Sequence, residues 1–222
     1  MEGGVGGKGD AARAAYQRAA ETQPGGVVGL AQVAMASGNT GEARRLCEEL
    51  VNRTPKSTLA WTMLAAAREA EKAYPEAIQA YQRAIALDKS NALAANNLAW
   101  RLATDKGDFD GAVKLAEHAR EIDPKNAAYA DTAGWIRFKM GDSPTAEKQL
   151  DEALRLQPKN ATFLYHRGVV LMMTGQDKGA LASLQAAVRI DPKLKELQDA
   201  LNRIDQLKAR LESAARKKEA QR

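Results

Sequence analysis

Apolar and polar positions follow a pattern that repeats along this chain. Four similar segments, each beginning with Leu or Ile followed by Asp or Gln, occupy residues 87–91 (LDKSN), 122–126 (IDPKN), 156–160 (LQPKN) and 190–194 (IDPKL). Their third residues are 35, 34 and 34 positions apart, and Pro55 precedes Lys89 by 34 positions. A fixed period of this length indicates an array of equal structural units, each containing the same helices and turns.

The period divides most of the chain into five repeats, each of which we expect to fold as two helices joined by a turn. Turn-forming segments lie near the middle of four repeats, at 37–41, 104–108, 140–144 and 174–178. Asn91, Asn126 and Asn160 stand just before the next expected helix, where their side chains can cap free N–H groups. The repeats are 24–57, 58–91, 92–126, 127–160 and 161–194, with one extra loop residue in the third.

Small residues recur at fixed places in the repeats. The eighth position holds Ala31, Ala65, Ala99, Gly134 and Gly168, and the twentieth holds Ala43, Ala77, Ala112, Ala146 and Ala180. A large side chain at either place would hold two helices apart. We therefore expect the two helices of each repeat to approach closely at these positions.

These features resemble the tetratricopeptide repeat (TPR) family, whose 34-residue pattern has a Trp, a Leu-Gly/Ala pair, two Ala and a Pro. The second repeat matches best, with Trp61, Leu64, Ala65, Ala77, Tyr81 and Ala84, although Lys89 replaces the proline. Arg68, Arg137 and Arg167 occupy places that are usually apolar, and we interpret them as stems over the core with heads in water. The resemblance implies an all-α, right-handed superhelical solenoid of antiparallel helix pairs that acts as a non-catalytic scaffold.

The ends of the array differ from its middle. Residues 10–23 align with the second helix of a repeat whose first helix is missing, so we expect the C-terminal part of a longer TPR protein, with 1–9 as a flexible Gly-rich segment. A natural N-terminal cap is the alternative. Residues 195–222 predict a capping helix and a basic tail. The apolar stripe of that helix is Leu194, Leu197, Leu201, Ile204, Leu207 and Leu211.

Composition excludes several classes of function. Hydrophobic residues make up 45% of the 222 residues but aromatic residues only 5%, which favours helices over sheets. Cys47 is the one cysteine and there are two histidines, so we expect no disulfide within the chain, no metal site and no cofactor. We expect Cys47 to be a buried, inert thiol and His118 to be solvated. Residues 3–10 lack the first Gly and the hydroxyl of a phosphate-binding loop.

The net charge of +5 lies mainly at the C-terminus, where residues 193–222 contain nine Lys/Arg against five Asp/Glu. The basic cluster at 216–218 is short and has no aromatic residues nearby for base stacking, so we expect no nucleic-acid partner. No apolar run approaches the length of a membrane span, so we expect no direct insertion into a membrane.

The expected binding surface is the concave groove, which the resemblance places along the first helix of each repeat. We expect a protein or peptide ligand there, with Trp100 and Trp135 side by side and Asn96 and Asp131 offering hydrogen bonds. The alternative is that the aromatic residues only fill gaps between helices. No Lys or Arg occupies positions 2, 5, 6 or 9, so capture of an acidic C-terminal tail is not expected. The candidate groove residues are Met63, Asn96, Asn97, Trp100, Asp131, Trp135, Phe138, Tyr165, His166 and Met172.

Two strings support a narrower resemblance. NNLAWRLA at 96–103 and DTAGWIRFKMGD at 131–142 are similar to repeats of bacterial TPR proteins of exopolysaccharide export, including exosortase-associated (PEP-CTERM) lipoproteins. That kinship implies a periplasmic or membrane-associated scaffold, and without it a cytoplasmic one. Two other functions remain open: a self-assembly module that forms a homodimer through its open N-terminal edge, and an enzyme or accessory of glycan synthesis, for which the sequence has no catalytic residues.

Overall fold

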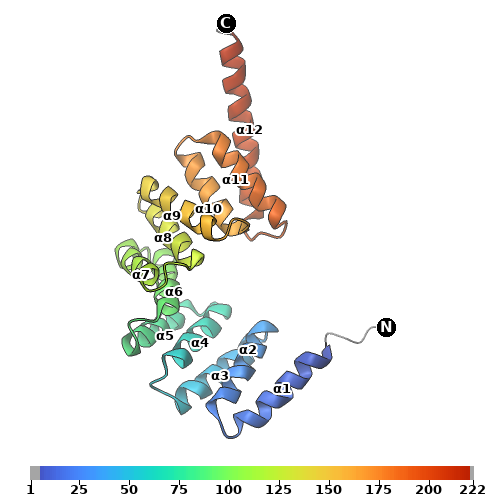
Figure 1. Ribbon diagram of the computed structural model, residues 1–222, viewed down its shortest axis with the longest axis vertical. Coiled ribbons are helices and arrows are strands. Elements are labelled where there is room, and N and C mark those ends of the chain that lie inside the picture. Colours follow the sequence, from blue (N-terminus) through green and yellow to red (C-terminus); the bar gives the residue numbers. More distant parts are fainter. Residues whose placement is uncertain (1–5, 221–222) are drawn as a thin grey trace. The chain divides into compact units, whose positions relative to one another are not determined.

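The computed structural model describes residues 6–220, and every regular element in that range is a helix. The chain forms two compact units, which we call the N-terminal unit (residues 1–107) and the C-terminal unit (residues 108–222). Within each unit, helices that are consecutive in sequence pack as antiparallel pairs (Figure 1). The predicted all-α fold class, a TPR-like solenoid with a long C-terminal helix, is confirmed.

The N-terminal unit contains both helices of the first two repeats and the first helix of the third. An additional helix, α1, precedes these repeats and contacts α2. The elements are α1 (Gly6–Ala20), α2 (Pro24–Ala36), α3 (Thr40–Arg53), α4 (Thr58–Ala70), α5 (Tyr74–Leu87), α6 (Ala92–Arg101) and the π-helical turn η1 (Leu102–Lys106).

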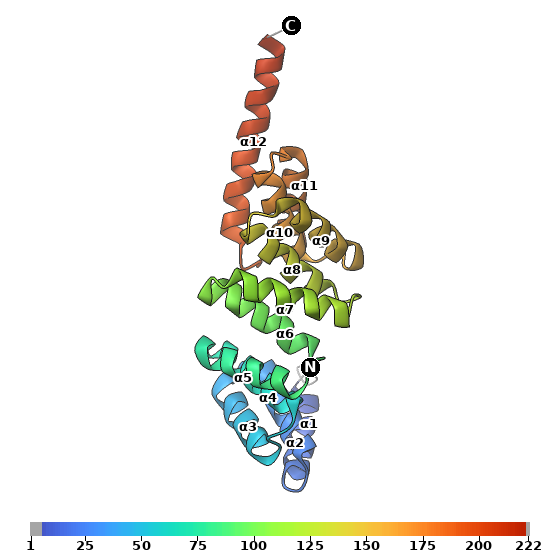
Figure 2. The same ribbon diagram turned by 90° about the vertical axis from the view of Figure 1, so that its left-hand side faces the viewer.

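The C-terminal unit contains the second helix of the third repeat, the last two repeats and a long final helix. Both views of the ribbon show the distal part of that helix, α12, extending past α11 (Figures 1 and 2). The elements are α7 (Phe109–Ile122), α8 (Ala127–Lys139), α9 (Ser143–Leu156), α10 (Ala161–Met173), α11 (Asp177–Ile190) and α12 (Leu197–Ala220).

The helices of the fourth and fifth repeats approach closely where the eighth and twentieth positions meet. A Cβ atom added to Gly134 would lie 3.1 Å from the carbonyl oxygen of Ala146. One added to Gly168 would lie 3.3 Å from the carbonyl oxygen of Ala180 and 2.6 Å from Cγ of Leu184. The alanines at these two positions are fully buried throughout the array. The predicted close approach is confirmed for these two pairs.

Between the two helices of each repeat lies one residue with positive φ. Glycine occupies this place in four repeats, as Gly38, Gly107, Gly141 and Gly175, with φ between 65° and 89°. In the second repeat the residue is Lys72, with φ of 61°. Because a Cβ atom makes this left-handed conformation unfavourable, Lys72 is strained where the other repeats are not. The second repeat is also the one for which the sequence showed no turn-forming segment.

The extra residue of the third repeat is absorbed differently from our expectation. We expected it in the loop, but the first helix of this repeat continues from α6 into η1, a single π-helical stretch. The i to i+5 hydrogen bonding of a π-turn accommodates one more residue than an α-helical turn. Gly107, whose N–H donates to the carbonyl oxygen of Leu102, then ends the helix.

The three predicted asparagine caps are present. Asn91, Asn126 and Asn160 each accept a hydrogen bond from a backbone N–H in the first turn of the following helix, at 3.0, 3.1 and 3.2 Å. Each cap satisfies a donor that the helix itself leaves free. These caps set where α6, α8 and α10 begin, and these helices carry most of the candidate groove residues.

Our interpretation of the three arginines was wrong, because their heads bind acids of the preceding repeat. Arg137 lies 3.4 Å from Glu117, and Arg167 donates to Asp151 at 2.6 Å. Arg68 is a more distant example, 4.0 Å from Glu48. The three side chains are only 23–30% exposed. Pairing compensates the charges for this partial loss of water.

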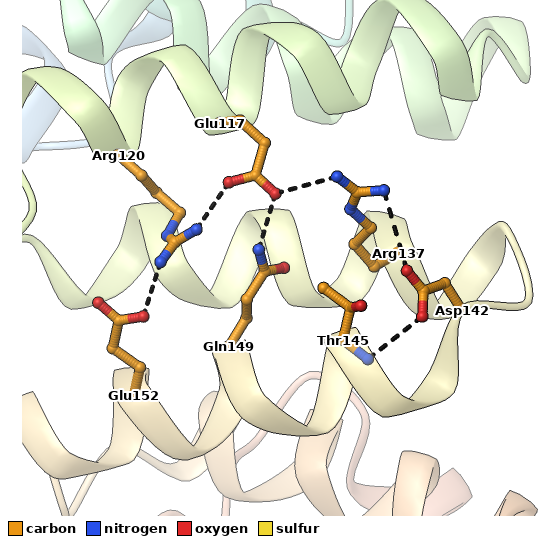
Figure 3. Close-up of polar contacts among 7 residues, drawn as sticks. All are labelled: Glu117, Arg120, Arg137, Asp142, Thr145, Gln149 and Glu152. Carbon is orange, nitrogen blue, oxygen red and sulfur yellow. Dashed lines mark hydrogen bonds and ion pairs between the residues drawn. The ribbon is translucent and has the colours of Figure 1, made fainter.

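Glu117 lies at the centre of a polar network that joins α7, α8 and α9 (Figure 3). Its carboxylate accepts hydrogen bonds from Gln149 at 2.7 Å and Arg120 at 2.6 Å, beside the contact with Arg137. Arg120 also donates to Glu152 at 2.6 Å. Burial raises the pKa of Glu117, but the hydrogen bonds and the two guanidinium charges outweigh it and lower that pKa below its usual range. Glu117 is therefore charged at neutral pH and links successive repeats.

Two expectations about the ends need correction. Helix α1 begins at Gly6, so residues 6–9 are helical, whereas residues 1–5 lie outside the described part. Extending a helix from an alanine-rich segment costs little compared with starting one. In α12, Ala200, Ile204 and Leu207 are buried, but Leu201 is 39% exposed. At 3.6 residues per turn, Ala200 takes the central place on the buried face and Leu201 lies at its edge.

Replacing Lys72 by glycine should stabilise the protein. Glycine removes the left-handed strain, which costs about 1–2 kcal/mol. Part of this gain is offset because glycine has more conformational entropy in the unfolded chain than lysine has. We expect the free energy of unfolding in urea to rise by about 0.5–1 kcal/mol. Lys72→Ala, which keeps the Cβ atom, is the control and should show no gain. Equal stability of the glycine and alanine variants would contradict the strain.

Replacing Gly168 by alanine should destabilise the protein. The new Cβ atom would overlap Leu184, and overpacking of this kind costs about 1–3 kcal/mol. Gly25→Ala is a matched control, because a Cβ atom there meets nothing within 4 Å. Urea unfolding should show a loss for Gly168→Ala and none for Gly25→Ala. A neutral Gly168→Ala variant would mean that the two helices can separate without cost.

Candidate functional site

The C-terminal unit contains an aromatic cluster on α8 and α10, with Trp135 at its centre. The Trp135 ring stacks on the ring of His166, with centroids 4.1 Å apart and an interplanar angle of 20°. Phe138 and Tyr165 lie beside it, at centroid distances of 5.4 and 6.4 Å. Such offset and tilted pairs are favourable arrangements of aromatic rings. The cluster therefore holds the indole in one orientation.

A buried polar pair lies beneath the indole. Nδ1 of His166 is 2.9 Å from each carboxylate oxygen of Asp131, and the two side chains are 5% and 7% exposed. Asp131 is on α8 and His166 on α10, so the pair links the first helices of two successive repeats. Buried polar groups of this kind contribute to a unique geometry more reliably than to net stability.

Tyr165 connects the cluster to α12. Its hydroxyl donates to Asp199 at 2.7 Å, and Arg203 donates to the same carboxylate. Burial and the bond to Asp199 raise the pKa of Tyr165 above its usual range. Burial raises the pKa of Asp199, but the hydrogen bonds from Arg203 and Tyr165 outweigh it and lower that pKa. Met172 lies beside this group, with its sulfur 4.0 Å from Nη1 of Arg203.

The accessible part of this region is smaller than the cluster itself. Trp135 and Phe138 are half-buried, whereas Lys139 is exposed and Met173 is 65% exposed. Nζ of Lys139 lies over both rings, 4.9 Å from the centroid of Trp135 and 5.8 Å from that of Phe138. We call Trp135, Phe138, Lys139 and Met173 the recognition surface. It combines apolar edges with one cation.

The N-terminal unit also contains a polar network between neighbouring helices. Tyr81 donates to Glu69 at 2.8 Å, and Asn97 donates to Tyr81 at 3.0 Å. Arg101 lies 3.1 Å from Glu69 and 4.5 Å from the ring centroid of Tyr74. Burial is the largest cause that raises the pKa of both Glu69 and Tyr81. These contacts join α4, α5 and α6.

The ten candidate groove residues divide into buried and partly exposed ones. We expected Asn96 and Asp131 to offer hydrogen bonds to a ligand, but they are 8% and 5% exposed. In the case of Asp131, the ring of His166 on α10 covers this place. The buried residues are Met63, Asn96, Asp131, Tyr165, His166 and Met172, and the half-buried ones are Asn97, Trp100, Trp135 and Phe138.

The remaining sequence predictions have mixed outcomes. Trp100 belongs to the N-terminal unit and Trp135 to the C-terminal unit, so their side-by-side placement stays a prediction. Cys47 is buried, as predicted, and burial raises the pKa of its thiol to about 11. The side chain of His118 is 44% exposed and lies 3.8 Å from Glu121. Lys139, four residues after Trp135 on the same helix, is at a position that the resemblance places on or near the groove, but it is not among the ten candidate residues.

Two further features concern the described residues only. No group of three or more His, Cys, Asp or Glu among residues 6–220 is arranged to hold a metal ion. No helix in that range combines the length and the apolar character needed to cross a membrane.

Comparison with known proteins gives one family and several similar folds. A family model described as tetratricopeptide repeat matches residues 28–92 and 132–195. A thermophilic TPR protein from Thermus thermophilus has 20% identity and a TM-score of 0.68, with 82% of this chain and 99% of that chain covered. No curated protein matches the chain.

Two other solved structures are similar to this chain. PilW, a type IV pilus biogenesis factor, has 20% identity and a TM-score of 0.69, covering 83% of this chain and 90% of its own. YrrB, a TPR protein with an unusual peptide-binding site, has 17% identity and a TM-score of 0.62, covering 85% and 98%. At these identities the likeness shows the fold alone.

The bond between Tyr165 and Asp199 predicts a pH-dependent contribution to stability. Asp199→Asn should lower the free energy of unfolding by about 1 kcal/mol at pH 7, because it weakens two hydrogen bonds. The folded-state pKa of Asp199 is below the unfolded value, so its contribution is present above about pH 4 and is lost as pH falls through the folded pKa.

Thermal unfolding between pH 7 and pH 3 should therefore show the difference between wild type and Asp199→Asn narrowing toward acid. Asp205→Asn, at an exposed position of the same helix, is the control and should differ little at any pH. A difference between wild type and Asp199→Asn that stays constant down to pH 3 would contradict the assignment.

Proposed function

Because the chain belongs to the tetratricopeptide repeat family, a family of protein–protein interaction scaffolds, we propose that it is a non-catalytic scaffold that binds a peptide segment of a partner protein at the recognition surface. The family establishes the interaction scaffold. The ligand class and the place of binding are the proposal.

The observation that carries the proposal is the fixed orientation of half-buried rings beside exposed apolar atoms. Trp135 is stacked on His166, and its neighbour Phe138 packs against the core of the C-terminal unit. Met173 is one of the most exposed large hydrophobic side chains of the described residues. Rigid aromatic anchors lose little entropy on binding and are the groups that contribute most at interfaces. YrrB, which has a peptide-binding site, supports a peptide as the class of ligand.

Other candidate functions have less support. A homodimer through the N-terminal edge and a place in polysaccharide export both remain predictions from the sequence, and neither has a structural observation in its favour. Light scattering at micromolar concentration separates the first from peptide binding, since a module of this kind that only binds peptides stays monomeric.

Trp135→Ala should weaken peptide binding. A suitable probe is a peptide obtained from a random twelve-residue library on the immobilised wild-type protein, with affinity measured by fluorescence polarisation. Loss of a central aromatic anchor costs about 2 kcal/mol or more, which is about thirtyfold in affinity. Trp135 also packs on His166, so the variant should lose some stability as well.

Phe163→Ala separates the two effects. Phe163 is buried in another core cluster of the same unit, which includes no residue of the recognition surface, so its truncation should cost about 3–5 kcal/mol of stability. The Phe163→Ala variant should keep the peptide affinity at a temperature where both variants are folded. Selected peptides that bind wild type and Trp135→Ala equally would rule out this surface.

A further inference from the structure

Lys139 is held in an unusual place for a lysine on a helix surface. It is the last residue of α8, and its ammonium group lies over the rings of Trp135 and Phe138 rather than extending from the helix. Attraction between the cation and the electron-rich ring faces favours this position. The two rings therefore favour a position of the charge at the recognition surface before any partner arrives.

Three carboxylates on or next to the helices around Lys139 pair with other side chains. Asp131 on α8 pairs with His166, and Asp199 on α12 pairs with Arg203 and Tyr165. Asp142, after α8, accepts a hydrogen bond from the backbone N–H of Thr145 and lies 3.9 Å from Arg137. Across the described part of the chain, no carboxylate lies within ion-pair distance of Lys139.

Arg101 provides a contrast within the same protein. It also lies over an aromatic ring, that of Tyr74, at 4.5 Å. Arg101 in addition pairs with Glu69 at 3.1 Å and with Asp105 at 3.4 Å, so its charge is compensated inside the fold. Lys139 likewise lies over aromatic rings, but among the described residues no carboxylate pairs with it as Glu69 and Asp105 pair with Arg101. The ammonium group of Lys139 is therefore open to a carboxylate from another molecule.

The apolar half of the surface lies on the neighbouring first helix. Met173 occupies on α10 the place that Lys139 occupies on α8, since the two residues are 34 positions apart. The helices α8 and α10 contact each other, and packed helix axes lie about 8–10 Å apart. That spacing suits two nearby side chains of one peptide, one charged and one apolar.

Building on the proposed peptide binding, we propose that the partner segment carries an aspartate or glutamate one or two residues from an apolar side chain. The carboxylate pairs with Lys139, and the apolar side chain contacts Met173 and the edge of Phe138. Because the rings already favour this position of the ammonium group, the pair forms with less entropy loss than an ordinary surface ion pair.

The test uses random twelve-residue peptides selected in parallel on wild type and on Lys139→Glu. Peptides from the wild-type selection should be enriched in Asp or Glu next to an apolar residue, and those from Lys139→Glu should be enriched in Lys or Arg at the same place. Complementary charge at an interface sets specificity in this way. Continued enrichment of acidic peptides on Lys139→Glu would overturn the inference.

A double-mutant cycle on one selected peptide gives the strength of the contact. Lys139→Gln should lower the affinity for an acidic peptide by about three- to tenfold. It should leave nearly unchanged the affinity for the same peptide with Asp replaced by Asn. Lys114→Gln, at an exposed position of α7, is the matched control and should alter neither affinity.

The outcomes separate this inference from the proposed function. Selected peptides that depend on Trp135 but show no acidic enrichment and no response to Lys139→Gln would overturn the inference and leave the proposed function standing. Peptides that do not depend on Trp135 would overturn both.

Discussion

Where the two helices of the fourth and fifth repeats cross, a glycine of the first helix lies against the carbonyl oxygen of an alanine in the second. The added Cβ distances of 3.1 and 3.3 Å are shorter than ordinary van der Waals contacts, so a larger residue would push the two helices apart. This contact fixes the separation and rotation of each helix pair, which in turn determines which face of α8 and α10 packs against the next repeat. Trp135 and Tyr165 take their places from that rotation.

Polar side chains connect the repeats that this packing brings together. The bonds of Glu117 to Arg137 and Gln149 link α7 to α8 and α9, Asp131 and His166 link α8 to α10, and Tyr165 and Asp199 link α10 to α12. Since these groups are buried or half-buried and bond to one another, they act as fixed connections. The rings above them are consequently held in one orientation, which suits a surface that recognises a partner without rearranging.

The repeat period, the small-residue positions and the asparagine caps could all be read from the sequence, because each depends on a local rule that recurs every 34 residues. The burial of Asn96 and Asp131 could not, because it depends on side chains from other helices. The same limit applied to Arg137, whose acidic partner is 20 residues away on another helix, and to Lys72, where nothing in the residue type indicates positive φ. The role of Lys139 depends on ring orientations that only the packed structure defines.

The central claim is that partner binding occurs at the ring edges of α8 and not elsewhere on the array. It is tested most directly by following the indole N–H signals of the three tryptophans by NMR during titration with a selected peptide. Trp61 is an internal reference, because its indole donates to the carbonyl oxygen of Pro55 in the N-terminal unit. The account predicts that the Trp135 signal moves with peptide concentration while that of Trp61 stays in place. A Trp135 signal that remains unchanged at saturating peptide would contradict it.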